Sequence, residues 1–241
     1  QLTEYETQRK PIWLNSAGYR KQIEKNALRC FHLATINGQS VSGVICLTND
    51  QMLGSWTCGD NTWDIEPIGI LNNPMSKDAY RVYKEDLAGK IQSSCGVKHT
   101  AHSQEVIPHV SFQEAPCIIL DIALAADKAV VERHGSIDKA ALWMLSILNA
   151  VQANYDDEFN SVIEFEVSEI YVAGSTQDDP WNGISTIDEH LEKSRSWAEA
   201  GGFAAPYSVA TAWTGKSYGV YGLAYVGSVC TPQRYNVCSD I

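Results

Sequence analysis

Cys95 has the sequence surroundings that best fit metal chemistry. Lys98 and His99 follow it closely and can lower the pKa of a thiol. Gly96 has no Cβ and lets the backbone approach a metal closely. A thiolate is a good fourth ligand for tetrahedral zinc, and in that place it excludes the water that a catalytic zinc needs. The sequence therefore favours an inhibitory, metal-binding role for Cys95, with an ordinary disulfide as the alternative.

The histidines do not supply a zinc-binding pair. None of the six stands in His-x-x-x-His spacing, which places two ligands on one helix face. His99, His102 and His109 form a loose group in a segment with little apolar periodicity. We expect these three side chains to be solvated or hydrogen-bonded.

The acidic clusters give no stronger lead. Residues 156–158 and 178–179 are expected to be solvated turns, because the loop spacing of an EF-hand is absent. Glu164, Glu166 and Glu169 lie along one strand region. The two that share a face are expected on the wet side of the sheet, not as an acid/base pair.

Seven cysteines are many for 241 residues and suggest an oxidising compartment. Six could form three disulfides, and the seventh would then be a metal ligand or an intermolecular link. Cys230 and Cys238 are expected to close a small disulfide loop, with pairing of either one beyond Ile241 as the alternative. The alternative is that several cysteines are buried and reduced.

The charge balance excludes one class of partner. The net charge is −11 and the sequence pI is about 4.9, whereas nucleic acids attract clustered Lys and Arg. No apolar run approaches the ~18 residues of a membrane span, and no signal peptide is recognisable at the start. We expect neither a nucleic-acid partner nor a membrane span.

The first part of the chain predicts a meander of short antiparallel strands. The expected strands cover residues 30–36, 41–47, 53–58 and 63–68. Asn37-Gly38 is a strong hairpin signal, because both residues tolerate positive φ.

The second part alternates between strand and helix patterns. Strands are expected at 117–125, at 162–173 with a possible bulge, and at 221–229; helices are expected at 137–155 and 185–200. Ser136 is the expected N-cap of the first helix, and Gly201-Gly202 closes the second. The apolar stripe of the first helix is Ala141, Met144, Leu145, Leu148, Val151 and Tyr155. This order predicts a mixed or parallel sheet with two helices packed on it.

Several segments together resemble a known protein family. Residues 63–68 and 80–84 are similar to the core of an ADAM-type prodomain. Residues 117–134, the helix carrying Asn149, and residues 210–216 resemble successive parts of a catalytic domain. Gly222-Leu223-Ala224-Tyr225-Val226-Gly227 is the most specific match. The family is that of the reprolysin/adamalysin (ADAM-like) metzincin zinc proteases.

The resemblance implies an α/β (α+β) proenzyme of two parts. Residues 1–110 would be a β-rich prodomain with the cysteine switch and linker, and residues 111–241 the N-terminal part of the catalytic domain. Cys95 would bind the catalytic zinc. Gly222, Leu223, Ala224, Tyr225 and Val226 would pair with an extended polypeptide substrate by β-augmentation.

The sequence departs from the family in one decisive respect. The His-Glu-x-x-His helix that holds zinc and supplies the general base is not among these residues. It would lie on a missing C-terminal half or a second chain, so the expected protein is a secreted, latent metalloendopeptidase. An uncovered apolar face at residues 221–229 would agree with a missing half, and a covered face would count against it. The alternative is a non-catalytic extracellular binding or structural module.

Overall fold

The computed structural model describes residues 2–5, 10–16, 18–24, 26–48, 51–67, 80–84, 96–99, 118–159 and 161–240; for 2–5 and 96–99 it describes the backbone only. Cys95 and Cys117, together with His102 and His109, lie outside the described residues.

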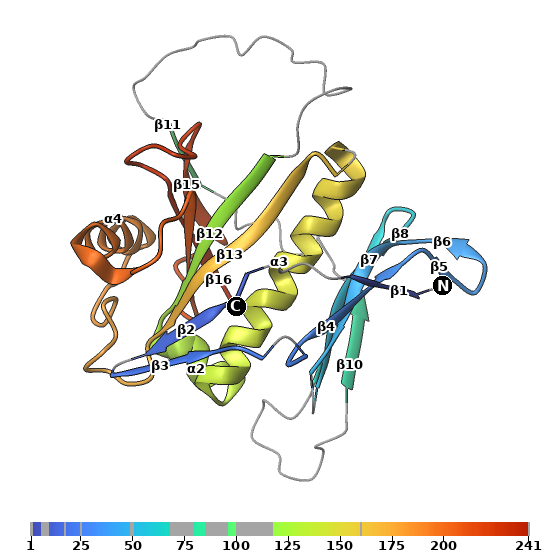
Figure 1. Ribbon diagram of the computed structural model, residues 1–241, viewed down its shortest axis with the longest axis horizontal. Coiled ribbons are helices and arrows are strands. Elements are labelled where there is room, and N and C mark those ends of the chain that lie inside the picture. Colours follow the sequence, from blue (N-terminus) through green and yellow to red (C-terminus); the bar gives the residue numbers. More distant parts are fainter. Residues whose placement is uncertain are drawn as a thin grey trace.

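Five strands of the second half form the centre of an eight-stranded mixed sheet (Figure 1). They are β12 (Ile118–Ala126), β13 (Ile163–Val172), β14 (Val209–Thr214), β15 (Gly222–Val226) and β16 (Tyr235–Ser239). β12 pairs in parallel with β13 and β14, β14 pairs in parallel with β16, and β15 runs antiparallel to β16. The expected bulge is present, since the register between β12 and β13 shifts after Ile122. These findings confirm the α/β fold class.

The two edges of this sheet are occupied by strands from the first half of the chain. β11 (Gly96–His99) pairs with β15 at one edge. β2 (Trp13–Ser16) pairs with β13 at the other edge, and β3 (Tyr19–Gln22) completes a hairpin with β2. Neither β2 nor β3 is predicted from the sequence.

The first half also forms a six-stranded antiparallel sheet. Its order is β1 (Leu2–Tyr5), β4 (Arg29–Leu33), β7 (Ser42–Leu47), β8 (Met52–Cys58), β9 (Asn61–Pro67) and β10 (Tyr80–Lys84). A small hairpin of β5 (Thr35–Ile36) and β6 (Gln39–Ser40) turns at Asn37 and Gly38, both of which have positive φ. The expected meander is therefore present.

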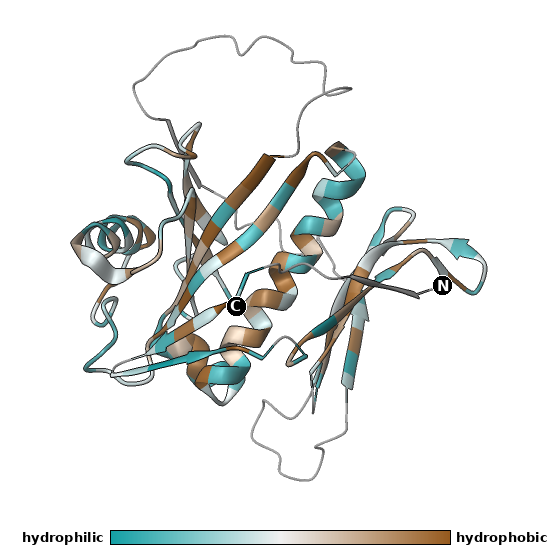
Figure 2. Cartoon of the chain, viewed as in Figure 1, coloured by the Kyte–Doolittle hydropathy of each residue, from teal (hydrophilic) through white to brown (hydrophobic). Residues whose placement is uncertain are grey.

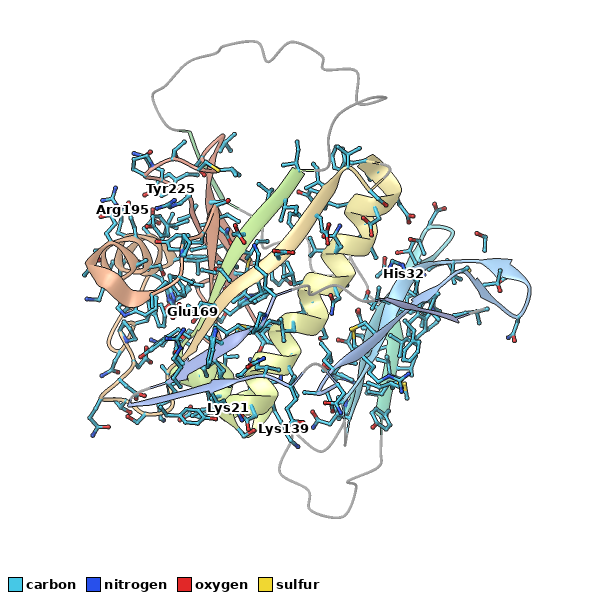
Figure 3. All side chains as sticks on the ribbon, in the orientation of Figure 1. Lys21, His32, Lys139, Glu169, Arg195 and Tyr225 are labelled. Atoms are coloured by element: carbon cyan, nitrogen blue, oxygen red, sulfur yellow. A yellow bond between two sulfur atoms is a disulfide. The ribbon has the colours of Figure 1, made fainter. Side chains whose placement is uncertain are left out.

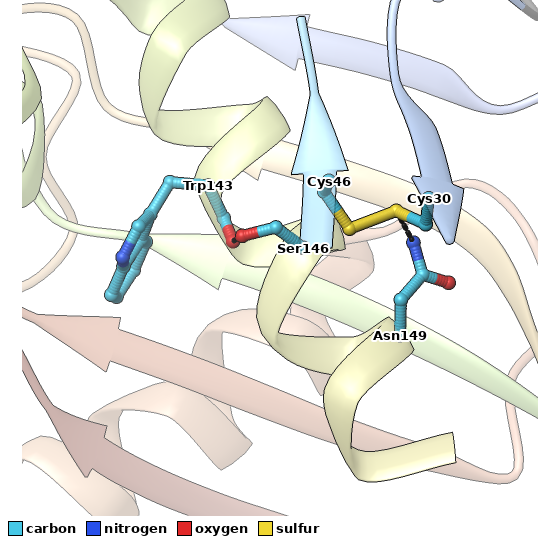
Figure 4. The surroundings of a disulfide bond; sticks show 5 residues. All are labelled: Cys30, Cys46, Trp143, Ser146 and Asn149. Atoms are coloured by element: carbon cyan, nitrogen blue, oxygen red, sulfur yellow. Dashed lines mark hydrogen bonds between the residues drawn. A yellow bond between two sulfur atoms is a disulfide. The ribbon is translucent and has the colours of Figure 1, made fainter. Parts of the chain in front are cut away.

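Helix α3 (Ile137–Phe159) lies between the two sheets (Figure 1). Its Met144 and Leu145 join the core against β12 and β13, whereas Ala153 packs against the disulfide Cys30–Cys46 of β4 and β7. Asn149 donates its Nδ2 proton to Cys30 Sγ over 2.9 Å (Figure 4). Along the helix, apolar and polar residues alternate (Figure 2).

Contact on two sides corrects the expected helix stripe. Val151 and Tyr155 are each 36% exposed, whereas Asn149 and Gln152 are buried. Gln152 accepts a hydrogen bond from Phe165 N and donates one to Ile163 O, so it ties the helix to β13. A single stripe of apolar spacing could not reveal a helix that faces two sheets.

The other helices have well-defined ends. α2 (Lys128–His134) begins at Asp127 and ends at Gly135 in the left-handed conformation. α4 (Ile187–Trp197) begins with a capping box formed by Thr186 and Glu189, and η3 (Ala198–Gly202) continues it. Gly201 has φ of 92°, as its predicted role at the helix end requires. Among the described residues, no helix is both long and apolar enough to cross a membrane.

The cysteine pattern differs from the expectation. Cys30 and Cys46 form the disulfide among the described residues, and Cys58 remains a thiol. Cys230 and Cys238 do not form the expected disulfide. Cys238 lies on β16, where its Sγ is 3.8 Å from Asn236 Oδ1. The short spacing between Cys230 and Cys238 did not indicate that a strand begins between them.

Candidate functional site: the β15 edge

The expected peptide-binding strand is β15, and a strand of the same chain is paired with it. β11 runs parallel to β15, with Gly96 opposite Leu223, Val97 opposite Ala224, Lys98 opposite Tyr225 and His99 opposite Val226. Four of the five expected substrate-binding residues therefore face the segment that directly follows Cys95. The main-chain N–H and C=O groups of this edge therefore pair with β11, as they would with an added peptide strand.

A close backbone approach fixes the position of β15 against β16. Gly222 is buried, and a Cβ at this residue would lie 2.8 Å from the carbonyl oxygen of Val237. At the other end, Gly227 has positive φ, and Ser228 Oγ donates to Tyr225 O over 2.8 Å. From the sequence, β15 is expected to be the last strand, but β16 follows it and lies between β15 and β14 in the sheet.

One face of β15 is covered by α4. Leu223 is 8% exposed and belongs to a core with Leu191 of α4 and Val237 of β16. Tyr225 donates its hydroxyl proton to Glu192 of α4, and Figure 3 shows Tyr225 beside this helix. Burial, followed by the contact with Glu192, raises the pKa of Tyr225 to about 12, so the phenol stays protonated. The expectation of an uncovered face is therefore wrong for the Leu223 side.

The opposite face of this part of the sheet is only partly covered. Along β14, Ala210, Ala212 and Thr214 lie on the same face as α4 and are buried. The alternate residues of β14 lie on the opposite face and are half-buried. The same alternation continues along β16 and β15. The half-buried or exposed residues on this face are Val209, Thr211, Trp213, Ala224, Val226, Asn236 and Cys238. Val226 is 48% exposed.

A buried carboxylate holds the loop beside this sheet region. Asp127 Oδ1 accepts hydrogen bonds from the backbone N–H groups of Val130 and Gly215, each over 3.1 Å, and its Oδ2 accepts one from Thr214 Oγ1. Asp127 thus joins the start of α2 to the end of β14. The sequence around Asp127 gave no indication of this connecting role.

The described residues do not make a metal site. They contain no group of three His, Cys, Asp or Glu side chains placed to hold a metal ion. His134 Nε2 lies 2.9 Å from Asp240 Oδ2 and its ring stacks on Trp143. His190 is fully buried and stacks on Trp181. Cys95, the expected zinc ligand, lies outside the described residues, so this donor set does not by itself fit zinc.

The second half of the chain matches the model of a known protein family. The model of Reprolysin_5, metallo-peptidase family M12, matches residues 119–241. The chain belongs to this family. The match begins in β12 and includes α2, α3, α4 and the strands up to β16, so this part is a protease-like domain. The predicted reprolysin relationship is confirmed.

Solved structures agree with the fold. Metalloproteinase-II from Bacteroides fragilis is 11% identical, with a TM-score of 0.51, over 99% of this chain and 70% of that chain. At this identity the similarity concerns the fold alone. A chain of a chaperone-substrate complex is 10% identical, with a TM-score of 0.38, over 84% of this chain and 26% of that chain, and carries no argument. No curated protein matches the sequence.

Proposed function

We propose that this chain is part of a latent, secreted zinc metalloendopeptidase of the reprolysin type. Residues up to about 110 act as the inhibitory prodomain, and residues from 111 onward are the N-terminal part of the catalytic domain. The pairing of β11 with β15 carries this proposal. An extended substrate needs the unpaired main-chain groups of a sheet edge, and β11 takes those of β15.

The position of β11 also supports the role of Cys95. This residue directly precedes Gly96, which lies opposite Leu223 in the expected substrate-binding strand. A Cys95 thiolate would be a suitable inhibitory ligand for zinc, because it would take the coordination position that a catalytic water needs. In reprolysins zinc polarises the peptide carbonyl and activates water, and this is the chemistry that zinc would supply here.

The remaining zinc ligands are proposed to come from a C-terminal half of the catalytic domain or a second chain. The partly covered face formed by β14, β16 and β15 supports this: Val209 and Trp213 pack against the core that contains α3, but Val226 on β15 remains 48% exposed and would be covered by a further element. The buried Leu223 counts against a missing element on the other face. The Cys30–Cys46 disulfide agrees with an oxidising, extracellular location.

The full-length native protein offers a direct test. We expect Cys95→Ala to hydrolyse a peptide substrate without prior cleavage, and a zinc chelator to abolish that activity. Cys58→Ala removes a thiol from β8 and is the matched control; it should stay latent. A Cys95→Ala protein that binds zinc but remains as inactive as Cys58→Ala would contradict the cysteine switch.

A second function is supported by the face of β15 that carries Leu223, because α4 already covers this face. The chain would then be an extracellular binding or structural module with a protease-like fold. This alternative predicts that the native protein contains no zinc and that neither cysteine variant hydrolyses peptide.

A further inference from the structure

The edge of β13, opposite the β15 edge, carries two buried carboxylates. Glu166 is 2% exposed and Glu169 is 1% exposed. Both lie on β13, on the face away from α3 (Glu169 is labelled in Figure 3). A buried carboxylate is costly unless a cation or hydrogen-bond donors compensate it.

Each carboxylate has a partner in the N-terminal segment, and Glu169 also accepts hydrogen bonds from the backbone of Ala204 and Ala205. Lys10 Nζ lies 2.6 Å from Glu166 Oε2 and 3.1 Å from Asp121 Oδ1, on the neighbouring strand β12. Glu166 Oε2 accepts no well-aligned hydrogen bond, so the Lys10 ammonium compensates its charge as an ion pair. Asn15 donates its Nδ2 proton to Glu169 Oε1.

Apolar residues of the same segment enter the core between these polar contacts. Ile12 is 6% exposed and Leu14 is fully buried, and both pack with Ile170 of β13. In the strand register Leu14 lies opposite Ile170 and Asn15 opposite Tyr171. The segment thus offers a cation, two apolar side chains and an amide in an extended conformation, each with a partner on the sheet.

We propose that the β13 edge is a second strand-docking site on the protease-like sheet, with residues 10–16 as its ligand in this chain. The site selects an extended peptide that presents a cation to Glu166 and Asp121 and a side-chain amide to Glu169. It keeps the N-terminal region attached even when the chain is cut before β12. This inference is independent of the proposed catalytic function.

The test uses the full chain with a recognition sequence for a site-specific protease in place of residues 103–109. After cleavage, the dissociation constant of the two pieces is measured with a fluorophore on the N-terminal piece. We expect Lys10→Met to raise this constant by roughly 10-fold, because the Lys10 side chain is 57% exposed but the Glu166 carboxylate that it compensates is buried and would be left unpaired. Lys21→Met is the matched control, since Lys21 pairs with Asp138 at an exposed site of the same hairpin; it should change the constant little.

A double variant excludes a general loss of structure. Lys10→Met combined with Glu166→Gln no longer buries an unpaired charge and should bind more tightly than Lys10→Met alone. None of these substitutions changes a residue of the contact between the six-stranded sheet and α3, so the comparison isolates the β13 edge. Equal constants for Lys10→Met and Lys21→Met, or no recovery in the double variant, would overturn the proposal.

Discussion

Glu169 has a structural role that the sequence did not indicate. The sequence places Glu164, Glu166 and Glu169 along one strand region, with the two that share a face on its wet side, but Glu166 and Glu169 are both buried in the fold. Its Oε2 accepts hydrogen bonds from the backbone of Ala204, over 2.9 Å, and Ala205, over 2.8 Å. The carboxylate therefore fixes the loop after η3 to β13.

Replacing Glu169 by Ala is expected to destabilise the protein by about 3 kcal/mol, because two buried amides lose a charged acceptor. The free energy of unfolding in urea measures this change. Glu199→Ala, at an exposed position of η3, is the control and should cost less than about 0.5 kcal/mol. Equal losses for the two variants would contradict the assigned role.

The sequence could not reveal this role for a physical reason. Alternation along a strand indicates which residues share a face, but not whether a distant segment covers that face. Here Lys10, Asn15 and the 204–205 loop cover it, and they are more than 30 residues away in the chain. The signal that was available is the group of acidic residues within a strand that is otherwise apolar.

His190 couples stability to pH. Burial, followed by the charge of Lys216, lowers its pKa to about 3. Its Nδ1 lies 3.2 Å from the hydroxyl of Tyr218, and its Nε2 has no hydrogen-bond partner among the described residues. The folded protein therefore keeps this imidazole neutral under conditions in which the unfolded chain binds a proton.

Acidification is expected to weaken the fold through His190. Below pH 6.5 the His190 imidazole binds a proton in the unfolded state, whereas in the folded state it remains neutral down to about pH 3. Stability from this residue is thus complete above pH 6.5 and falls by up to about 1.4 kcal/mol per pH unit below it. Unfolding free energies at pH 7.0, 6.0 and 5.0 should show this slope, and His190→Phe should flatten it. An unchanged slope in the variant would exclude His190 as its source.

At the scale of elements, β15 depends on a glycine at its start. A Cβ at Gly222 would lie 2.8 Å from Val237 O, so the two strands would have to separate. β15 presents the β11-paired edge on its other side. A change at Gly222 should therefore disturb this edge as well as the core.

Gly222→Ala is expected to destabilise the protein by about 1–3 kcal/mol through this overlap. Hydrogen exchange should show faster exchange of the β15 and β16 amides, with β12 and β13 less affected. Ala224→Gly, two residues along the same strand, is the control without a new Cβ. If Gly222→Ala exchanged no faster than this control, the close approach would not govern the strand.

Elements with local signals were predictable, and those defined by distant pairing were not. Helices α3 and α4, the Asn37-Gly38 hairpin and the meander strands have signals within a few residues and were expected, whereas the short capped helix α2 was not. By contrast, β2, β11 and β16 are short strands, and each pairs with a strand that is not its neighbour in the sequence. For the candidate site, the sequence located β15 but gave no sign of the strand paired with it.

At the scale of the whole molecule, the first half of the chain flanks the protease-like sheet on three sides. β11 lies on one edge, β2 and β3 extend the other edge, and the six-stranded sheet packs on α3 (Figure 1). In the proposed function this arrangement maintains latency, because β11 is held near β15 by the other two attachments. A tethered segment rebinds at high effective concentration.

The zinc content and intact mass of the native protein test the central claim most directly. We predict zinc in the native protein and, under denaturing conditions, a species above 26.6 kDa or a second fragment beside it. That additional sequence should contain His-Glu-x-x-His. A single species of 26.6 kDa without zinc would contradict the latent protease and favour the binding module.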